Sequence, residues 1–239
     1  MSDQFQHVMV LISIVIGLGI TNLLLGVSGA IERYTENTRP FRICWATVFW
    51  LAYLFLLMVL FWWWEFRLLE VLKQWSLWNY FLIICYAVVL FLQVALLIPA
   101  DWDKVDDLNE YFLAKRRWFY SVFALSLIID LIDSYMKGGL PYIEGTGIVT
   151  WGFNLVGLLA AVVGFRSTRI RTHSTIAIVF LLWEVIIGFD VSPLLHARPN
   201  SAMQRTAERP MIHFMSVCRL PASYVDDVSG LAVSDFVSR

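Results

Sequence analysis

The sequence predicts an all-α protein, a bundle of helices that crosses a membrane six times. Of the 239 residues, 59% are hydrophobic, against about 45–50% in a soluble domain. Only 15% are charged, where a soluble protein carries about a quarter, and the mean hydropathy is +0.68. The apolar residues also gather in runs of about 20, the length that a helix needs to cross a bilayer. This composition excludes a cytosolic globular protein, a disordered chain and a disulfide-rich secreted domain.

Six apolar runs are long enough to span the membrane. The first three contain no Lys or Arg, whereas the fourth and the sixth carry carboxylates. The runs cover roughly residues 8–31, 43–64, 78–98, 118–136, 147–165 and 174–192. We therefore expect residues 1–192 to form one transmembrane domain. Residues 193–239 are rich in Arg, Ser, Pro and Ala, which predicts a polar, mostly disordered tail; a folded capping element is the alternative.

The first run is predicted to be a retained span rather than a signal peptide. It is preceded by MSDQFQH, which carries no positive charge, and it is longer than the apolar region of a signal peptide. Residues 100–117, between the third and fourth runs, place acids before bases and space Val105, Leu108 and Phe112 near one helical face. This pattern fits a short amphipathic helix on the membrane surface or a plain polar connector.

Basic residues predict the orientation, because loops rich in Lys and Arg stay in the cytoplasm. The connections after the first, third and fifth runs hold most of them, and the opposite side has few even when the tail is counted. Both termini are therefore expected outside the cytoplasm. The basic residues expected on the cytoplasmic side are Arg33, Arg39, Arg42, Lys104, Lys115, Arg116, Arg117, Arg166, Arg169 and Arg171.

Small residues recur along the first run at a spacing that predicts helix packing. Small side chains let neighbouring membrane helices approach closely. The expected packing residues are Ser13, Gly17, Thr21, Gly26 and Ala30.

The sequence gives little support to an enzyme. Residues 26–29 read GVSG, which matches the GxSG pattern of rhomboid-type intramembrane serine proteases, but that chemistry needs a histidine as proton acceptor. His7 and His173 fall at the boundaries of the predicted spans, and His196 and His213 fall in the tail. The same distribution argues against a haem bound by two histidines. We therefore expect no catalytic activity, no cofactor and no metal.

Acids within the apolar runs are the strongest functional signal. A carboxylate at the middle of a bilayer costs about 2.5–3.5 kcal/mol on insertion scales and is expected to face the bundle interior. Asp130 and Asp133 share a face of the fourth run, and Glu184 lies near the middle of the sixth. Together with Asn154 and Asp190, they predict a polar pocket that could bind protons or cations. In the alternative, Asp133 pairs with Lys137 at the surface and Asp190 marks the end of the span.

The sequence resembles a group of uncharacterised multi-pass bacterial inner-membrane proteins. The resemblance rests on the opening FQHVMVLISIVIGLGITNLLLGVSGAIER, on FWWWEF at the end of the second run and on the YF…KRRWFY stretch. It covers residues 5 to about 190 and implies a bacterial inner membrane, without implying an activity.

Two functions remain open at this point. The first is a transporter-like or ion- or proton-linked membrane protein that uses the intramembrane acids. The second is a non-catalytic membrane subunit or scaffold that packs against a partner protein or a second copy through its small-residue first span. The bilayer is the expected environment in both. A net charge of −1 argues against a nucleic-acid partner.

Overall fold

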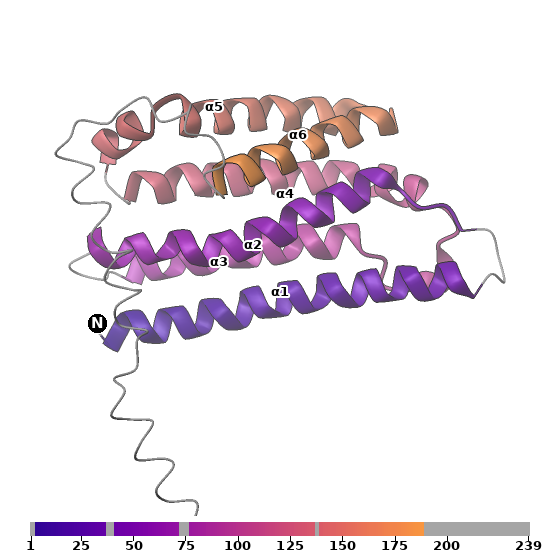
Figure 1. The fold of residues 1–239 in the computed structure, drawn as a ribbon, viewed down its shortest axis with the longest axis horizontal. Coiled ribbons are helices and arrows are strands. Elements are labelled where there is room, and N and C mark those ends of the chain that lie inside the picture. Colours follow the sequence, from indigo (N-terminus) through magenta and orange to yellow (C-terminus); the bar gives the residue numbers. More distant parts are fainter. Residues whose placement is uncertain (1–2, 37–40, 72–76, 137–138, 189–239) are drawn as a thin grey trace, which may run out of the picture. The chain divides into compact units, whose positions relative to one another are not determined.

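The computed structural model describes residues 3–36, 41–71, 77–136 and 139–188. In these residues the fold is helical, which confirms the predicted class (Figure 1). The elements are α1 (Asp3–Thr35), α2 (Trp45–Val71), α3 (Leu77–Leu97), the 3-10 turn η1 (Trp102–Lys104), α4 (Leu108–Met136), α5 (Gly139–Arg166) and α6 (Ile170–Gly188). The predicted tail and Asp190 lie outside the described residues.

Four segments are long and apolar enough to cross a membrane, which indicates a membrane-embedded protein. They are Met9–Thr35, Leu77–Leu97, Leu108–Met136 and Ile170–Gly188. The apolar segments found in α2 and α5, Trp45–Phe61 and Gly152–Arg166, are shorter. Each of the six predicted runs overlaps one of the helices α1 to α6.

Helix α4 begins earlier than the fourth run predicts. Leu108 and Phe112 are buried in the core, so the amphipathic pattern of this region belongs to the first turns of α4 and not to a separate surface helix. The physical reason is that these apolar side chains have a protein interior to enter. The basic residues at 115–117 consequently lie on α4 itself.

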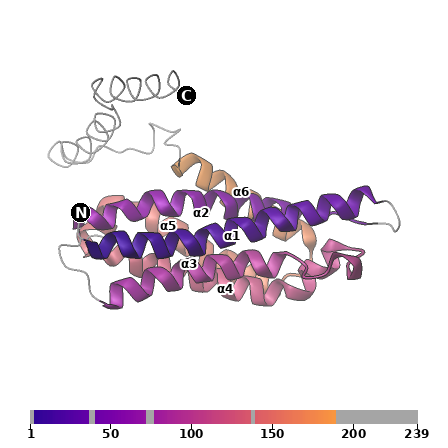
Figure 2. The ribbon, with the colours of Figure 1, turned by 90° about the horizontal axis from the view of Figure 1, so that it is seen from below.

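Successive helices run in opposite directions, as short connections require, and pack side by side (Figures 1 and 2). Helix α1 packs mainly on α3, α3 on α4, and α4 on α5, while α2 packs along α6. The core holds large side chains from α2, α3, α4 and α6, including Trp50, Leu90, Phe123 and Phe180.

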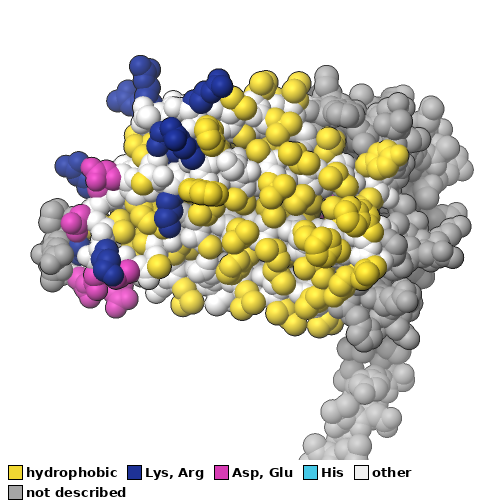
Figure 3. Space-filling model, turned by 180° about the vertical axis from the view of Figure 1, so that it is seen from behind, with side chains coloured by type: hydrophobic (Ala, Val, Ile, Leu, Met, Phe, Trp, Pro, Cys, Tyr) yellow, Lys and Arg dark blue, Asp and Glu magenta, His cyan; other side chains and the backbone are white. Residues whose placement is uncertain are grey.

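Charged side chains gather at one end of the bundle. Figure 3 shows Lys, Arg, Asp and Glu at that end of the visible face, with hydrophobic side chains over the rest. We call it the charged end; it contains the last turns of α1 and α5, η1 and the first turns of α2, α4 and α6. The described basic residues that the sequence places on one side all belong to elements at this end, whereas Arg39 lies outside the described residues.

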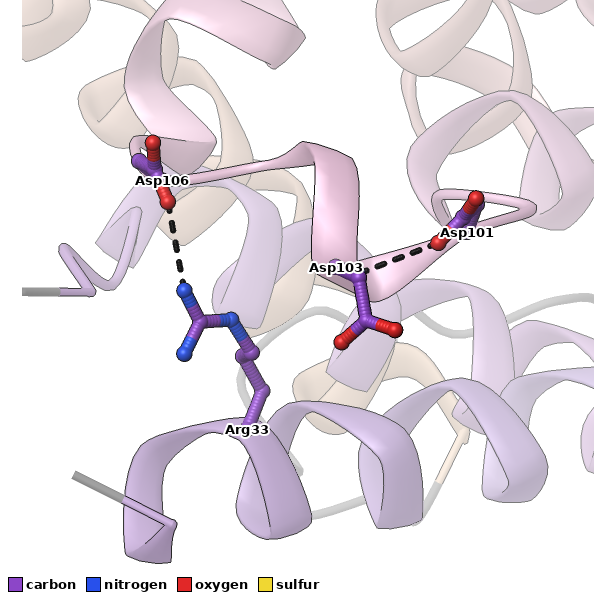
Figure 4. A network of polar contacts seen from close by, with 4 residues as sticks. All are labelled: Arg33, Asp101, Asp103 and Asp106. Atoms are coloured by element: carbon purple, nitrogen blue, oxygen red, sulfur yellow. Dashed lines mark hydrogen bonds and ion pairs between the residues drawn. The ribbon is translucent and has the colours of Figure 1, made fainter. Parts of the chain in front are cut away.

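Two connections are joined at the charged end. The Arg42 amide donates to the Asp106 carbonyl (3.0 Å), and the Leu108 amide donates to the Arg42 carbonyl (3.1 Å). Arg33, which is buried near the end of α1, pairs with Asp106 through Nη2 and Oδ1 at 3.2 Å (Figure 4). These contacts fix the connection between α1 and α2 against the one between α3 and α4.

The turn η1 is held by its own polar contacts. Asp101 caps it by accepting a hydrogen bond from the Asp103 amide (3.1 Å, Figure 4), and Lys104 pairs with Asp101 at 2.7 Å. A hollow of about 440 Å³ opens between η1 and the end of α1 and is lined mainly by acidic residues together with Arg33.

Candidate functional site

Buried polar side chains from five helices meet inside the bundle, nearer the end opposite the charged end. We call this group the acid cluster, and its members are Tyr53 of α2, Tyr86 of α3, Asp130 and Asp133 of α4, Asn154 of α5 and Glu184 of α6. All except Asp130 are buried, and Asp130 is half-buried. Polar groups on apolar helices turn towards one another because lipid offers them no hydrogen-bond partner.

Asp130 is held by two donors from neighbouring helices. The Tyr86 hydroxyl donates to Oδ1 (3.1 Å), and the Asn154 side-chain amide donates to Oδ2 (3.2 Å). Hydrogen bonds to an ionised acceptor are stronger than those between neutral groups. The two bonds therefore tie α3 and α5 to α4 through one carboxylate.

Glu184 has a different environment. Only 2% of its surface is exposed, and its Oε1 atom makes no hydrogen bond to any described residue. The charged side chain that acts on it in the described part of the chain is Asp130, another carboxylate. Glu184 therefore combines burial, a free acceptor atom and a like-charged neighbour.

Tyr53 and Asp133 complete the acid cluster. The Tyr53 hydroxyl lies within electrostatic range of both Glu184 and Asp130, and Tyr86 lies within range of Asp130 and Asp133. Asp133 is 3% exposed, so its side chain faces the interior and not the surface. Lys137, its expected surface partner in the alternative interpretation, lies outside the described residues.

The structure thus brings together Asp130, Asp133, Glu184 and Asn154, the described members of the predicted pocket. Sequence reasoning missed Tyr53 and Tyr86, whose only signal is a hydroxyl within an apolar run. It also did not select Glu65 of α2, which is buried as well.

Two hollows in the described part of the chain are lined by residues other than the carboxylates of the acid cluster. The larger lies at the charged end. The smaller, about 20 Å³, lies between α5 and α6 and is lined by apolar side chains. No three His, Cys, Asp or Glu side chains of the described residues come together in a group that could hold a metal ion.

The small residues of α1 divide between two faces. Gly26 lies against Ile98, whose side chain would overlap an added Cβ. Ser13, Gly17 and Thr21 lie on the exposed face instead. The hydroxyls of Ser13 and Thr21 donate to carbonyl oxygens one turn back in α1, and nothing lies within 4 Å of an added Cβ at Gly17.

The reason for this division is the position of the buried face of α1, which carries Met9, Ile12, Ile16 and Leu23. Ala30, the remaining predicted packing residue, is half-buried near the charged end. Packing of the Ser13, Gly17 and Thr21 face against another protein stays a prediction.

A second polar group contains one of the histidines. His173 lies in the first turn of α6, and its side chain is fully buried. Its Nδ1 is hydrogen-bonded to the Tyr120 hydroxyl of α4 at 2.9 Å. The α6 helix begins at Ile170, about one turn before the predicted apolar run, which is why the sequence places this residue outside the span.

Aromatic rings fill the space between this histidine and the acid cluster. Trp50 of α2 is fully buried and contacts rings from α2, α4 and α6. Its centroid distances are 4.9 Å to Phe119, 5.1 Å to Phe123, 5.5 Å to Tyr53, 6.0 Å to Tyr120 and 6.2 Å to Phe180.

Comparison of the chain with protein-family models, with curated protein sequences and with solved structures gives no match.

Proposed function

We propose that the protein is a proton-linked transport protein of the bacterial inner membrane, in which Glu184 and Asp130 form the proton-binding site. In this proposal all six helices span the bilayer, the charged end faces the cytoplasm and both termini lie outside. The collection of basic residues at one end supports this orientation, because positively charged connections are retained in the cytoplasm. The acid cluster then lies in the outer half of the membrane.

Glu184 is the observation that carries the proposal. Burying an ionised carboxylate in an apolar interior is costly unless a positive charge accompanies it. The charged neighbour of Glu184 in the described part of the chain is itself an acid. A bound proton removes the charge of Glu184 and with it the repulsion from Asp130. It also gives the carboxyl group a hydrogen-bond donor.

The two carboxylates have different roles in this proposal. Asp130 accepts hydrogen bonds from Tyr86 and Asn154, which stabilise its ionised form. No described residue donates a hydrogen bond to Oε1 of Glu184, so a proton shared by the pair resides on Glu184. In other proteins, two acids with unequal environments likewise divide the roles, one staying ionised while the other holds the proton. Asp133 and Tyr53 supply further polar groups next to the pair.

Proton flux into proteoliposomes tests the proposal. The purified full-length chain is reconstituted with a pH-sensitive dye inside, and a potassium diffusion potential drives protons across the membrane. We expect Glu184→Gln to abolish the flux, because the amide cannot exchange a proton, and Asp130→Asn to reduce it strongly. Glu110→Gln is the matched control, since Glu110 is an exposed acid at the charged end of α4. Wild-type flux in a correctly folded Glu184→Gln variant would refute the proposal.

A non-catalytic membrane subunit is the second candidate, and the exposed face of α1 favours it. No described residue lies within 4 Å of an added Cβ at Gly17, so the described part of the chain leaves room there for a helix of a second copy or of a partner protein. Cross-linking through cysteines placed at Gly17, followed by mass spectrometry from intact membranes, distinguishes the two candidates when it is combined with the flux assay. Specific cross-links without proton flux support the subunit.

A further inference from the structure

A second polar pair lies between the charged end and the acid cluster. The Tyr120 hydroxyl of α4 and Nδ1 of His173 in α6 are 2.9 Å apart, and both side chains are buried. Along their helices, Tyr120 precedes Asp130 and His173 precedes Glu184 by about three turns, roughly 15 Å at 1.5 Å per residue. The two buried polar groups therefore occupy different depths of the same bundle.

The imidazole of His173 has one ring nitrogen available. Its Nε2 atom is buried and makes no hydrogen bond to a described residue. Phe112 of α4 packs edge-on against the ring at 5.1 Å, Arg116 of α4 acts on it electrostatically, and the Ser167 backbone lies close by, before α6 begins. From α2, Trp50 contacts the ring of Tyr120. The pair thus lies close to the basic residues of the charged end.

An aromatic layer separates this pair from the acid cluster. Trp50 contacts both Tyr120 and Tyr53. Phe123 and Phe180 pack around it, with ring centroids 5.2 Å apart from each other. Tyr53 in turn lies within range of Glu184 and Asp130. Polar groups capable of proton exchange therefore flank both sides of one apolar layer.

Gln93 of α3 adds a polar group at an intermediate depth. It is fully buried, and neither its side-chain oxygen nor its side-chain nitrogen is hydrogen-bonded to a described residue. Tyr86, which contacts Asp130, lies seven residues earlier, so the two side chains project from the same face of α3. An amide can both donate and accept a hydrogen bond, so Gln93 offers both capacities in the interior.

We propose that the His173–Tyr120 pair is the proton-exchange site on the charged side of the bundle and that it serves the Glu184 site across the aromatic layer of Trp50, Phe123 and Phe180. This inference rests on the proposed function. In the tautomer whose Nδ1–H donates to Tyr120, the lone pair of Nε2 binds one proton from the charged end. The imidazolium then releases one proton towards the Glu184 carboxylate, which accepts it; the ring returns to its neutral form, and no other bond changes.

Proton flux at varied pH on the charged side tests the inference. Proteoliposomes of one orientation keep the opposite side at constant pH. Wild-type flux is expected to depend on the pH of the charged side, with a midpoint set by the protonation of His173. His173→Gln is expected to remove this dependence and to slow the flux about a hundredfold, the lower end of the contribution of a positioned proton-transfer group. The flux of the His173→Gln variant is expected to keep its dependence on the pH of the opposite side, since Glu184 and Asp130 are intact.

Two further variants on α4 sharpen the test. Tyr120→Phe keeps the ring and removes the hydroxyl, and it is expected to shift the midpoint without abolishing the dependence. Tyr111→Phe is the matched control, because the Tyr111 hydroxyl donates to the Ile98 carbonyl (2.9 Å) near the charged end; it is expected to behave as the wild type. Wild-type pH dependence in a folded His173→Gln protein would overturn the inference while leaving the Glu184 proposal intact. Flux through Glu184→Gln would instead overturn the proposed function.

Nuclear magnetic resonance of ¹⁵N-histidine in the wild-type protein in nanodiscs keeps the inference testable if the variant does not fold. The signal of a residue that exchanges protons with the charged side changes between the neutral and the charged imidazole as the pH is lowered from about 8 to about 5. Its assignment to the buried ring comes from nuclear Overhauser contacts to Phe112. A buried imidazole signal that stays constant over this range would overturn the inference.

Discussion

Replacing Trp50 by alanine is expected to destabilise the bundle more than any exposed tryptophan substitution. Trp50 is fully buried, and its edge-on contacts with Phe119 (4.9 Å) and Phe123 (5.1 Å) have the geometry that aromatic pairs prefer. Truncating a buried tryptophan costs about 3–5 kcal/mol, because lost contacts and an unfilled cavity add together. Rings surround Trp50 from three helices, so the site has little freedom to collapse. We expect a loss in the upper half of that range.

The assay is reversible unfolding in mixed micelles of a mild detergent and sodium dodecyl sulfate, followed by far-ultraviolet circular dichroism. Trp118→Ala is the control on α4, because the Trp118 side chain is 71% exposed and surface substitutions usually change stability by less than about 0.5 kcal/mol. Trp50→Phe, which refills part of the space, is expected to fall between the two. Equal unfolding free energies for Trp50→Ala and Trp118→Ala would refute the packing argument.

Two smaller perturbations follow from close contacts. Gly164→Ala is expected to lower the free energy of unfolding by about 1–3 kcal/mol through overpacking, because an added Cβ would overlap the Tyr120 ring. Gly152→Ala on the same helix is the control, since no described atom lies within 4 Å of an added Cβ there. Equal unfolding free energies of the two variants would contradict the overpacking. At η1, the hydrogen bond from Lys104 lowers the pKa of Asp101 and raises the pKa of Lys104. The pair therefore stabilises the turn at neutral pH, and its contribution is lost as acid protonates Asp101 below about pH 4 or as base neutralises the lysine. The Asp103 amide, which donates a hydrogen bond to the Asp101 carboxylate, reports on the turn through its rate of hydrogen exchange. In the wild type its protection should fall at acidic pH, and in Lys104→Met it should already be low at pH 7. Full protection in that variant at pH 7 would contradict a stabilising role for the pair.

The helices could be predicted because the bilayer leaves few alternatives. A run of about 20 apolar residues has one regular way to satisfy its backbone in lipid. The boundaries were harder to place, since α4 and α6 begin in segments where polar residues alternate with apolar ones. Because α6 begins at Ile170, His173 lies in its first turn, and its burial could not be predicted from the apolar run alone.

The acids of the candidate site could also be predicted, because the cost of burying Glu184 in a membrane makes it conspicuous in the sequence. Their partners could not. Tyr53 and Tyr86 are ordinary core residues until α2 is known to pack along α6, and α3 on α4. The spacing of small residues likewise identifies a face of α1 but not what covers that face. The exposure of Gly17 could therefore not be predicted from the sequence.

The joined connections at the charged end have a consequence for biosynthesis. Arg42 leaves the ribosome well before Asp106 and Leu108, yet its backbone amide and carbonyl are bonded by those two residues. Buried Arg33 is likewise synthesised before Asp106, the residue with which it pairs. The connection between α1 and α2 is therefore completed only after α3 and the first turn of α4 have been synthesised. This end of the bundle forms when the two connections meet, and neither connection reaches its final structure alone.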